Sequence, residues 1–408
     1  MRVLLIDPWG IANTSEYLNG LISGLSKKTE LTVITNYNFK CKDENDYSAR
    51  IYHWFFKKSE NISTGILRKI IRGLEYAIAY RKIIRHLRKE QQYDVVHINW
   101  LLNYSLDVSF LKKIKKFSRK LVYTAHNVIP HINGEKSIKI LRQVYSYPDR
   151  IILHGKAVKQ DFIKLYPEYE DKVYIQKHGS NLIPNIFYDT SDIDPDIICK
   201  IEKYKKIFIC FGYIFEDKGI DRVVYLWNNE WKNTLLIIAG KTDKAYSELN
   251  DVLMKKNLDN LLFLNRFVDN NTLNYLIDKS DIIVLPYRKA SMSGVVFTAC
   301  DFSKTILTTK VGAISEYLIN GIDSFVVNND DLELHKKIED IVNNISCEQL
   351  STMGIALHTN INNTCSWDVI TTKLIHECYE DINEKNCTIS NDNITDGGDC
   401  HINKKSLA

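Results

Sequence analysis

The sequence predicts an α/β protein made of two doubly wound domains that face each other across a cleft. Short runs of β-branched residues and leucine alternate with helix-length amphipathic segments, and this alternation starts afresh after residue 181. A chain of 408 residues is too long for one ordinary hydrophobic core. Its composition, 45% hydrophobic and 25% charged, is that of a globular protein able to bury two cores.

The first domain is expected over residues 1–180. Its apolar runs predict strands at 3–6, 31–35, 94–98, 121–125, 150–154 and 172–176. After the first run, Tyr17, Leu18, Leu21 and Leu25 recur at helical spacing. Short apolar strands separated by helices are typical of a parallel sheet that is covered on both faces.

The second domain is expected over residues 181–358, with strands predicted at 207–212, 234–240, 261–264, 281–285, 305–309 and 324–327. Residues 179–196 are rich in Asn, Asp and Pro and predict the linker between the domains. Ligands of open parallel sheets bind beyond the carboxyl ends of the strands, so we expect function on the loops that follow them. Residues 386–408 contain few large apolar side chains and are predicted to be disordered.

Cysteine usage and hydropathy bear on the cellular location. Nine cysteines without a Cys-x-x-Cys pair predict a reducing compartment and no structural zinc. No uncharged apolar stretch approaches the roughly 20 residues needed to cross a bilayer. The first apolar run is also too short for a signal peptide. We therefore expect a cytoplasmic protein, peripheral at the inner face of the cell membrane.

Charge is distributed unevenly along the chain. Residues 1–180 carry 31 Lys and Arg against 17 Asp and Glu, a net of +14, which leaves −10 for the remainder of the overall +4. Much of the excess lies in residues 66–89, where apolar positions at mostly helical spacing alternate with Lys and Arg and predict a basic amphipathic helix or helix pair. Such a segment suits an anionic membrane surface. The alternative is a core-facing helix with a solvated basic face, and no nucleic-acid motif accompanies it.

The segment from Ser280 to Cys300 predicts a site for phosphate. A buried strand gives way to a polar loop, and Ser293-Gly294 then opens a helix. Helix N-termini present unpaired N–H groups and partial positive charge, which suit a diphosphate. The alternative is that Ser293 and Gly294 only cap the helix.

Six blocks occur in the order found in a known family: 211–221, 236–240, 281–286, 293–294, 311–316 and 320–321. In these blocks the chain resembles the GT-B glycosyltransferases of the glycosyltransferase-4 type, over roughly residues 1–379. The resemblance implies two Rossmann-like domains, a nucleotide-sugar donor on the second domain and an acceptor on the first. It also implies a final helix, within residues 359–385 and starting at Ser366-Trp367, that crosses back to the first domain.

The resemblance assigns roles to particular residues. Lys218 would pair with the donor diphosphate, whose charge grows as the glycosidic bond breaks, and His126 would lie at the reaction centre. Gly212 and Gly294 would let the backbone approach the phosphates. Further donor contacts are expected at Tyr213, Arg266, Phe267, Val268, Ser293, Val295, Thr298 and Glu316. Acceptor-side candidates are Asp7, Gly10, Glu16 and His131, and Phe267 has the alternative of being a core residue.

The chain also departs from the family pattern. The two glutamates that usually stand eight residues apart are replaced by Ala290 and Thr298, and the first phosphate contact, often Arg, is Tyr213. Arg288 is expected to supply the missing positive charge. This variant resembles a sub-branch of bacterial polysaccharide glycosyltransferases. No Asp-x-Asp lies beside the donor loop, so neither a metal nor another cofactor is expected.

Together these features predict a hexosyltransferase that uses a UDP- or GDP-sugar in surface polysaccharide or lipopolysaccharide synthesis. The acceptor is expected to be a lipid-linked glycan. The stereochemical outcome stays open: retention needs no protein nucleophile, whereas inversion needs a general base, for which Asp7 and Glu16 are the candidates. The alternatives are a nucleotide-sugar epimerase or hydrolase on the same fold, and an inactive scaffold or binding protein.

Overall fold

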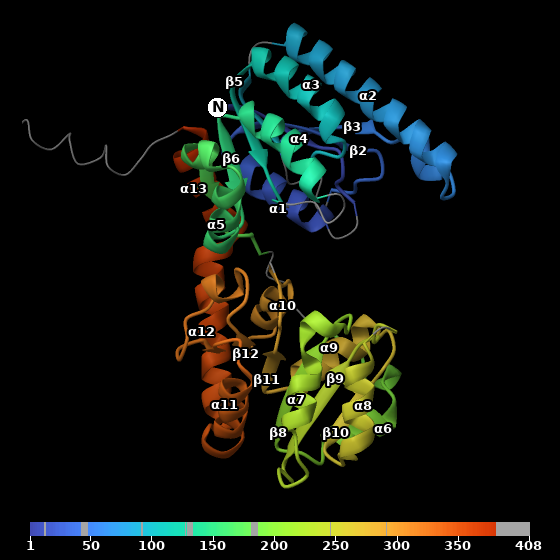
Figure 1. Cartoon of the computed structure of the whole chain (residues 1–408), viewed down its shortest axis with the longest axis vertical. Coiled ribbons are helices and arrows are strands. Elements are labelled where there is room, and N and C mark those ends of the chain that lie inside the picture. Colours follow the sequence, from blue (N-terminus) through green and yellow to red (C-terminus); the bar gives the residue numbers. More distant parts are fainter. Residues whose placement is uncertain are drawn as a thin grey trace, which may run out of the picture.

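The computed structural model describes residues 1–11, 14–41, 48–90, 93–126, 128, 134–180, 187–244, 246–290 and 292–380. Two parallel sheets, each with helices on both faces, confirm the predicted fold class (Figure 1). The predicted tail at 386–408, part of the linker and His131 lie outside the described residues.

The first sheet has seven parallel strands in the order β3-β2-β1-β4-β5-β6-β7. They are β1 (Arg2–Asp7), β2 (Glu30–Asn36), β3 (Ala49–Phe55), β4 (Tyr93–Ile98), β5 (Ser118–Thr124), β6 (Arg150–Leu153) and β7 (Val173–Ile175). All were predicted except β3, a half-exposed edge strand that carries Arg50 and His53 among its apolar residues and so lacks a continuous apolar run. In register, Leu4 pairs with Thr32 on one side and Val96 on the other.

Helices from both ends of the chain cover this sheet. On one face α1 (Ser15–Ser26) packs beside α13 (Trp367–Lys373) and the π-helical turn η8 (Leu374–Tyr379). The opposite face is covered by α2 (Ile66–Lys89), α3 (Tyr104–Ile114), α4 (Gly134–Ser146) and α5 (Lys156–Leu165). Residues 66–89 therefore form one helix rather than a pair.

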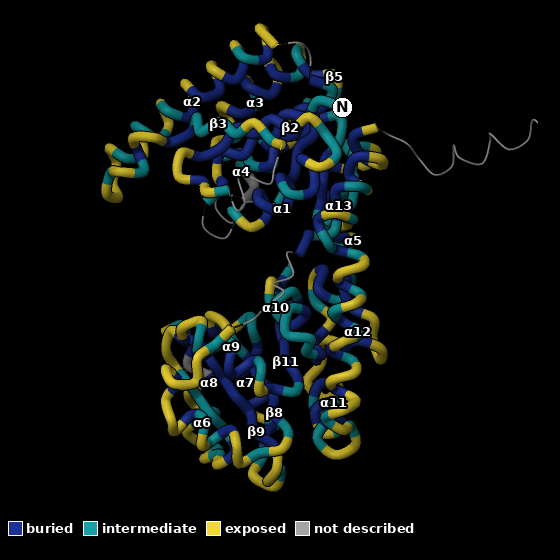
Figure 2. The backbone as a smooth tube through the Cα atoms, turned by 180° about the vertical axis from the view of Figure 1, so that it is seen from behind, coloured by how far each residue is buried: buried dark blue, intermediate teal, exposed yellow. Residues whose placement is uncertain are grey.

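The second sheet has six parallel strands in the order β10-β9-β8-β11-β12-β13. They are β8 (Lys206–Phe211), β9 (Thr234–Ala239), β10 (Leu261–Leu264), β11 (Ile282–Leu285), β12 (Thr305–Thr309) and β13 (Ser324–Val327). One face packs on α6 (Pro195–Ile201), α9 (Asn270–Lys279), α10 (Val295–Asp301) and α12 (Cys347–Cys365). The other face packs on α7 (Ile220–Leu226), α8 (Ser247–Lys256) and α11 (Asp331–Asn344). The inner strands of both sheets are buried along most of their length (Figure 2). The edge strands β3, β7 and β10 are only partly buried.

A single helical column connects the two domains (Figure 1). Helix α12 packs on the second sheet, Ser366 interrupts it, and α13 continues onto the first domain. At the junction the amide of Ser180 donates to the carbonyl of Cys365 at 2.8 Å. The indole of Trp367 lies in the space left by Gly20 and Gly179, where an added Cβ would stand 1.9 Å and 2.5 Å from the ring.

Both sheets have a topological switch point, the place where the strand order reverses. In the first sheet it lies between β1 and β4, and in the second between β8 and β11. Crevices at the carboxyl ends of strands beside a switch point are the usual ligand sites of such sheets. The loops after these four strands are therefore the first places to look for function.

We expect Gly20→Ala to lower the free energy of unfolding by about 1–3 kcal/mol, because the new methyl group collides with Trp367. The matched control is Gly73→Ala in α2, where an added Cβ meets nothing within 4 Å. That change should be neutral or stabilising by up to about 1 kcal/mol, since alanine favours a helix interior over glycine. Urea unfolding of both variants measures the contrast, and equal effects would contradict the close packing of Trp367.

Candidate active site

The switch point of the first sheet holds a buried carboxylate. Asp7 ends β1, and Asn99, which follows β4, donates from its side-chain nitrogen to Asp7 Oδ2 at 2.6 Å. The other oxygen accepts the backbone N–H groups of Trp9 and Gly10, both at 2.9 Å. Burial raises the pKa of Asp7 to about 6, although these three hydrogen bonds act in the opposite direction. Asp7 thus fixes the loop after β1 and orients Asn99.

The other acceptor-side candidates of the first loop differ in their surroundings. Gly10 has φ +48°, and a Cβ there would lie 2.5 Å from Thr35 Oγ1, so both the backbone and the packing require glycine. Glu16 is exposed in the first turn of α1. Contact of either residue with an acceptor remains a prediction.

His126 follows β5 and is the third residue of a hydrogen-bonded series that begins at Asp7 and continues through Asn99. Its Nε2 lies 3.1 Å from Asn99 Oδ1, and its ring stacks on Trp100 with 4.1 Å between centroids. The Asn99 oxygen can only accept a hydrogen bond, so Nε2 carries the proton and Nδ1 keeps its lone pair. Burial holds the pKa of His126 well below its usual value, which keeps the imidazole neutral. The ring is therefore ready to accept a hydrogen bond at Nδ1.

Two more histidines follow strands at the same edge of the sheet. His154 comes after β6 and His178 after β7, and both contact the ring of Tyr17, as do His126 and Trp367, with centroids 5.0–5.4 Å apart. We call His97, His126, His154 and His178 the histidine cluster; His97, in β4, hydrogen-bonds Tyr379 and Thr124, each at 2.7 Å. Burial lowers the pKa of His97 and of His154 to about 3.

The switch point of the second sheet holds a half-buried lysine, Lys218. Lys218 lies in the short 3-10 helix η6 (Glu216–Lys218) after β8, with Nζ 3.9 Å from the ring centroid of Tyr287 and 5.7 Å from that of Phe215. Among the described residues no carboxylate lies within ion-pairing distance of its ammonium. Burial lowers the pKa of Lys218. A half-buried cation that stands over aromatic rings is a candidate for binding an anion.

Two further segments meet at Tyr287, which follows β11. Its hydroxyl lies 3.1 Å from Oγ of the buried Ser293, just before α10, and its carbonyl accepts the Thr309 hydroxyl at 2.6 Å, at the end of β12. Lys218 and Ser293 are thus brought to the same aromatic ring. Val295 and Thr298 lie half-buried on α10, the helix that follows.

Two predicted phosphate-contacting glycines have open space above them. A Cβ added to Gly212 (φ +109°) or to Gly294 would meet nothing within 4 Å. Gly219 and Gly240 differ, because a Cβ there would stand 2.2 Å from the Pro286 carbonyl and 1.8 Å from the Gly212 carbonyl. Packing within the protein therefore explains why Gly219 and Gly240 are glycines. Gly294 has an ordinary helical φ, so neither its backbone conformation nor its packing requires a glycine there.

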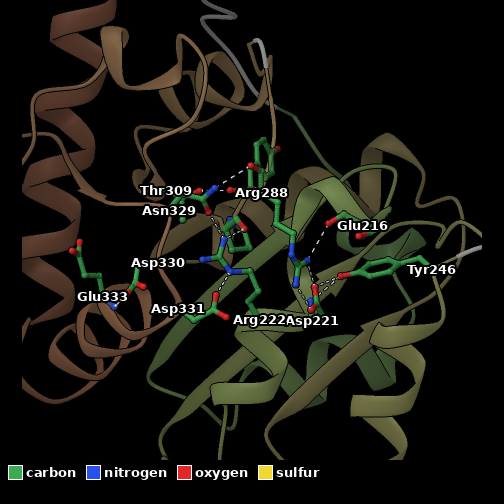
Figure 3. Close-up of polar contacts among 12 residues, drawn as sticks. Glu216, Asp221, Arg222, Tyr246, Arg288, Thr309, Asn329, Asp330, Asp331 and Glu333 are labelled. Carbon is green, nitrogen blue, oxygen red and sulfur yellow. Dashed lines mark hydrogen bonds and ion pairs between the residues drawn. The ribbon is translucent and has the colours of Figure 1, made fainter. Parts of the chain in front are cut away.

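Arg288 is paired within the protein (Figure 3). Its two terminal nitrogens each donate to one oxygen of Asp221 at 2.6 Å, and one of them also reaches the Glu216 carbonyl at 3.1 Å. Its backbone N–H donates to Asp217 at 2.8 Å. Burial alone would raise the pKa of Asp221, but the hydrogen bonds from Arg288 and Tyr246 hold this pKa below its usual value. Arg288 therefore clamps the loop that carries Lys218; its predicted contact with phosphate remains a prediction.

The remaining donor candidates lie around the second sheet. Tyr213 is exposed and donates its hydroxyl to Asp243 at 2.9 Å. Phe267 is 81% exposed, so its alternative assignment as a core residue is wrong, whereas Val268 is buried in the core. Arg266, between the strand end and Phe267, is exposed. The exposure of Arg266 and Phe267 leaves them accessible to a base, and that role stays a prediction.

Glu316 joins the two domains. It lies in the 3-10 helix η7 (Ile314–Tyr317), and its two carboxylate oxygens accept the backbone N–H groups of Lys156 and Ala157 at 2.8 Å and 3.1 Å. These are the first residues of α5, where a negative charge is favourable. The neighbouring Tyr317 hydroxyl accepts the His178 amide at 2.7 Å. Glu316 thus caps a helix of the opposite domain, and its predicted role in donor binding remains untested.

The described part of the chain contains no group of three or more His, Cys, Asp or Glu side chains that is arranged to hold a metal ion. Within the same residues, no helix combines the length and apolarity that a membrane crossing demands.

Two family profiles match the chain, one in each half. The profile described as Glycosyltransferase Family 4 matches residues 21–182, and the profile described as Glycosyl transferases group 1 matches residues 205–344. The chain is a group 1, family 4 glycosyltransferase. This glycosyltransferase is 22% identical, over 337 residues, to an uncharacterised glycosyltransferase of Methanocaldococcus jannaschii. The match covers 82% of the chain and 86% of that relative.

Solved structures share the fold of this glycosyltransferase. The Anabaena protein HepE in complex with UDP has a TM-score of 0.63 at 14% identity, covering 92% of this chain and 98% of HepE. An E. coli trehalose-6-phosphate structure bound with UDP-2-fluoro glucose has a TM-score of 0.62 at 12% identity, covering 93% and 99%. At such identities the likeness concerns the fold, which confirms the GT-B architecture.

Sequence reasoning missed Asn99, His154 and His178. A signal like the one that singled out His126 was available for each of them, namely a polar residue at or just beyond the end of a predicted strand. What the sequence did not show is that His154 and His178 meet His126 around one tyrosine of α1, Tyr17. The link from Asp7 through Asn99 to His126 depends on strands that are not consecutive in the chain.

The histidine cluster should make this glycosyltransferase sensitive to acid. The pKa of His154 is lower in the folded protein than its ordinary value of 6.5, so below that pH the unfolded chain binds more protons and stability falls as pH falls toward about 3. We expect its contribution to fall by about 1.4 kcal/mol per pH unit in this window. His154→Asn should flatten the pH dependence of the urea-unfolding free energy between pH 7 and 5.

The matched control is His335→Asn, in α11 and outside the histidine cluster. This variant should keep the pH dependence of the wild type. We compare how steeply the unfolding free energy changes with pH in each variant, rather than its absolute value. This separates the effect of protonation from the effect of lost packing. Equal slopes for the wild type and His154→Asn would contradict the account.

Proposed function

We propose that this glycosyltransferase transfers a hexose from a UDP-sugar to a glycan acceptor carried on a lipid, at the cytoplasmic face of a membrane, in the synthesis of a surface polysaccharide. The donor would bind at the switch point of the second sheet and the acceptor at that of the first. UDP is preferred over GDP because two structures of the same fold hold UDP or a UDP-sugar analogue.

The observation that carries the proposal is Lys218. Its ammonium lies on Tyr287 without an acidic partner among the described residues, beside Ser293 and close in sequence to Gly212. A diphosphate placed here would meet a cation, and the open space over Gly212 and Gly294 would let it approach the backbone. As the bond to the sugar breaks, the departing UDP gains negative charge, which Lys218 stabilises. Arg288 acts as a positioning residue, because it holds the Lys218 loop through Asp217, Glu216 and Asp221.

His126 is proposed to act at the reaction centre of the first domain. With its Nε2 proton directed to Asn99, the neutral ring offers Nδ1 to a sugar hydroxyl. Asp7 orients Asn99 and thereby fixes the tautomer of His126. Both oxygens of Asp7 are already hydrogen-bonded, which suits an orienting role better than proton abstraction from the acceptor.

Helix α2 supports the membrane contact. Its exposed face carries an apolar row in the first half, formed by Ile66, Leu67, Ile70, Leu74 and Ile78, each 56–78% exposed. The second half of the same face is basic, with Arg81, Lys82, Arg85, Arg88 and Lys89 all exposed. From Tyr76 onward one side of α2 faces the core, so the alternative of a core-facing helix holds for that part of the helix. Its buried residues are Tyr76, Ala79, Tyr80, Ile83, Ile84 and Leu87. The exposed start of α2 extends beyond the sheet (Figures 1 and 2).

This division suits a helix that dips its first half into the acyl region and keeps its basic end among anionic headgroups. The cytoplasmic location is supported by Cys199, which is exposed and forms no disulfide with another described residue.

Lys218→Ala should weaken UDP binding by about 1.5–3 kcal/mol, roughly 10- to 100-fold, because a charge-assisted contact is lost. Titration calorimetry with UDP measures this. Lys232→Ala is the matched control and should leave the affinity unchanged. Lys232 is exposed just before β9, at the amino ends of the strands and therefore away from the proposed site.

Unaltered affinity in Lys218→Ala would contradict the donor site. Failure of UDP to bind or to raise the melting temperature of the wild type would contradict the proposed donor and favour an inactive scaffold. Hydrolysis or epimerisation of UDP-glucose without transfer to any acceptor would favour the other enzymatic alternative.

A further inference from the structure

A cavity of about 250 Å³ lies in the first domain beneath the first half of α2. Its lining includes Trp9, Phe56, Lys69, Arg72, Tyr76 and Asn103, and we call it the α2 pocket. It combines aromatic faces with two basic side chains. Nothing in the donor site or in the histidine cluster accounts for this combination.

The walls of the α2 pocket are held firmly. The Tyr76 hydroxyl donates to the buried Asp107 at 2.7 Å and accepts the Leu102 amide at 3.2 Å. Phe56 is fully buried with φ +63°, a conformation that a bulky side chain rarely adopts. Strain of this kind persists only where the surrounding structure enforces it, and it concentrates at functional sites.

The α2 pocket carries an excess of positive charge. Arg72 lies 3.9 Å above the ring of Phe56 and pairs with Glu60 at 2.8 Å. Arg68 pairs with the other oxygen of the same carboxylate at 3.2 Å, so two guanidinium groups share one negative charge. Lys69 is exposed and has no carboxylate partner among the described residues. An anion at the rim of the pocket would therefore meet Lys69 and the incompletely neutralised Arg72.

Aromatic side chains connect the α2 pocket with the reaction centre. Trp9, 38% exposed, donates its backbone N–H to Asp7 and lies 6.5 Å from Trp100 between ring centroids. Trp100 in turn stacks on His126. A sugar ring placed on Trp9 would thus be next to the hydrogen-bonded series Asp7, Asn99 and His126.

We infer that the α2 pocket binds the anionic linkage of the acceptor, a saccharide joined to its lipid through phosphate. The phosphate contacts Lys69 and Arg72, and the first sugar lies on Trp9. The lipid leaves toward the exposed apolar row of α2, which begins at Ile66 beside Lys69. This inference rests on the proposed function and adds to it the chemical class of the acceptor and the residues that recognise it.

The test uses the full chain and two probes, farnesyl phosphate-linked glucose and farnesyl glucoside, which carries the same sugar and the same lipid without phosphate. Binding is followed by titration calorimetry without membranes. The wild type should bind the phosphate-linked probe about tenfold more tightly or better, as expected for a charge-assisted contact. Lys69→Gln should remove most of that preference, and Trp9→Leu should weaken both probes.

Lys112→Gln is the matched control, because Lys112 is an exposed lysine on α3 and not part of the α2 pocket. It should bind both probes as the wild type does. Equal affinity of the wild type for the two probes, or equal losses in Lys69→Gln and Lys112→Gln, would overturn the inference. UDP affinity, measured on the same samples, separates this result from a failure of the proposed function, since UDP should bind all these variants equally.

Discussion

The arrangement of the two domains depends on how Trp367 packs. Its indole lies against Gly20 and Gly179, where no side chain larger than hydrogen fits, and its ring contacts Tyr17. This contact attaches α13 to the first sheet, while α12, one residue earlier in the chain, belongs to the core of the second. The bond from Ser180 to Cys365 closes the same junction from the linker side. The packing of Trp367 therefore fixes the point on the first sheet from which the second domain extends.

This arrangement brings the carboxyl edge of the first sheet to the second domain. His178, after β7, contacts Phe297 of α10 and the Tyr317 hydroxyl, and Glu316 caps α5. Tyr17 connects this interface with the histidine cluster, so the packing of Trp367 and the environment of His126 are coupled through one aromatic ring. A change in domain orientation would therefore alter the surroundings of His126, the proposed reaction centre.

The sequence was sufficient to predict the fold, and it indicated the loops on which the proposed site lies. Apolar runs marked twelve of the thirteen strands among the described residues, and most of these twelve are buried. Strand β3 was missed because Arg50 and His53 interrupt its apolar residues. The loops after the strands could be identified, and with them His126 and Lys218. Pairings between distant side chains could not, since they depend on how loops from different strands meet.

Arg288 and Glu316 illustrate this limit. Each has a charge that suits a nucleotide-sugar site, and in the sequence each stands in a donor-like block. In the folded chain Arg288 is paired with Asp221 and Glu316 caps α5 of the other domain. The partners lie 67 and 160 positions away along the chain, where no local pattern reveals them.

The central claim is that the donor diphosphate binds at the switch point of the second sheet. Hydrogen exchange of the full chain with and without UDP tests it most directly. The account predicts slower exchange of backbone amides in residues 212–219 and 292–298, with the α2 pocket unaffected. Protection confined to the first domain, or no protection with saturating UDP, would contradict it.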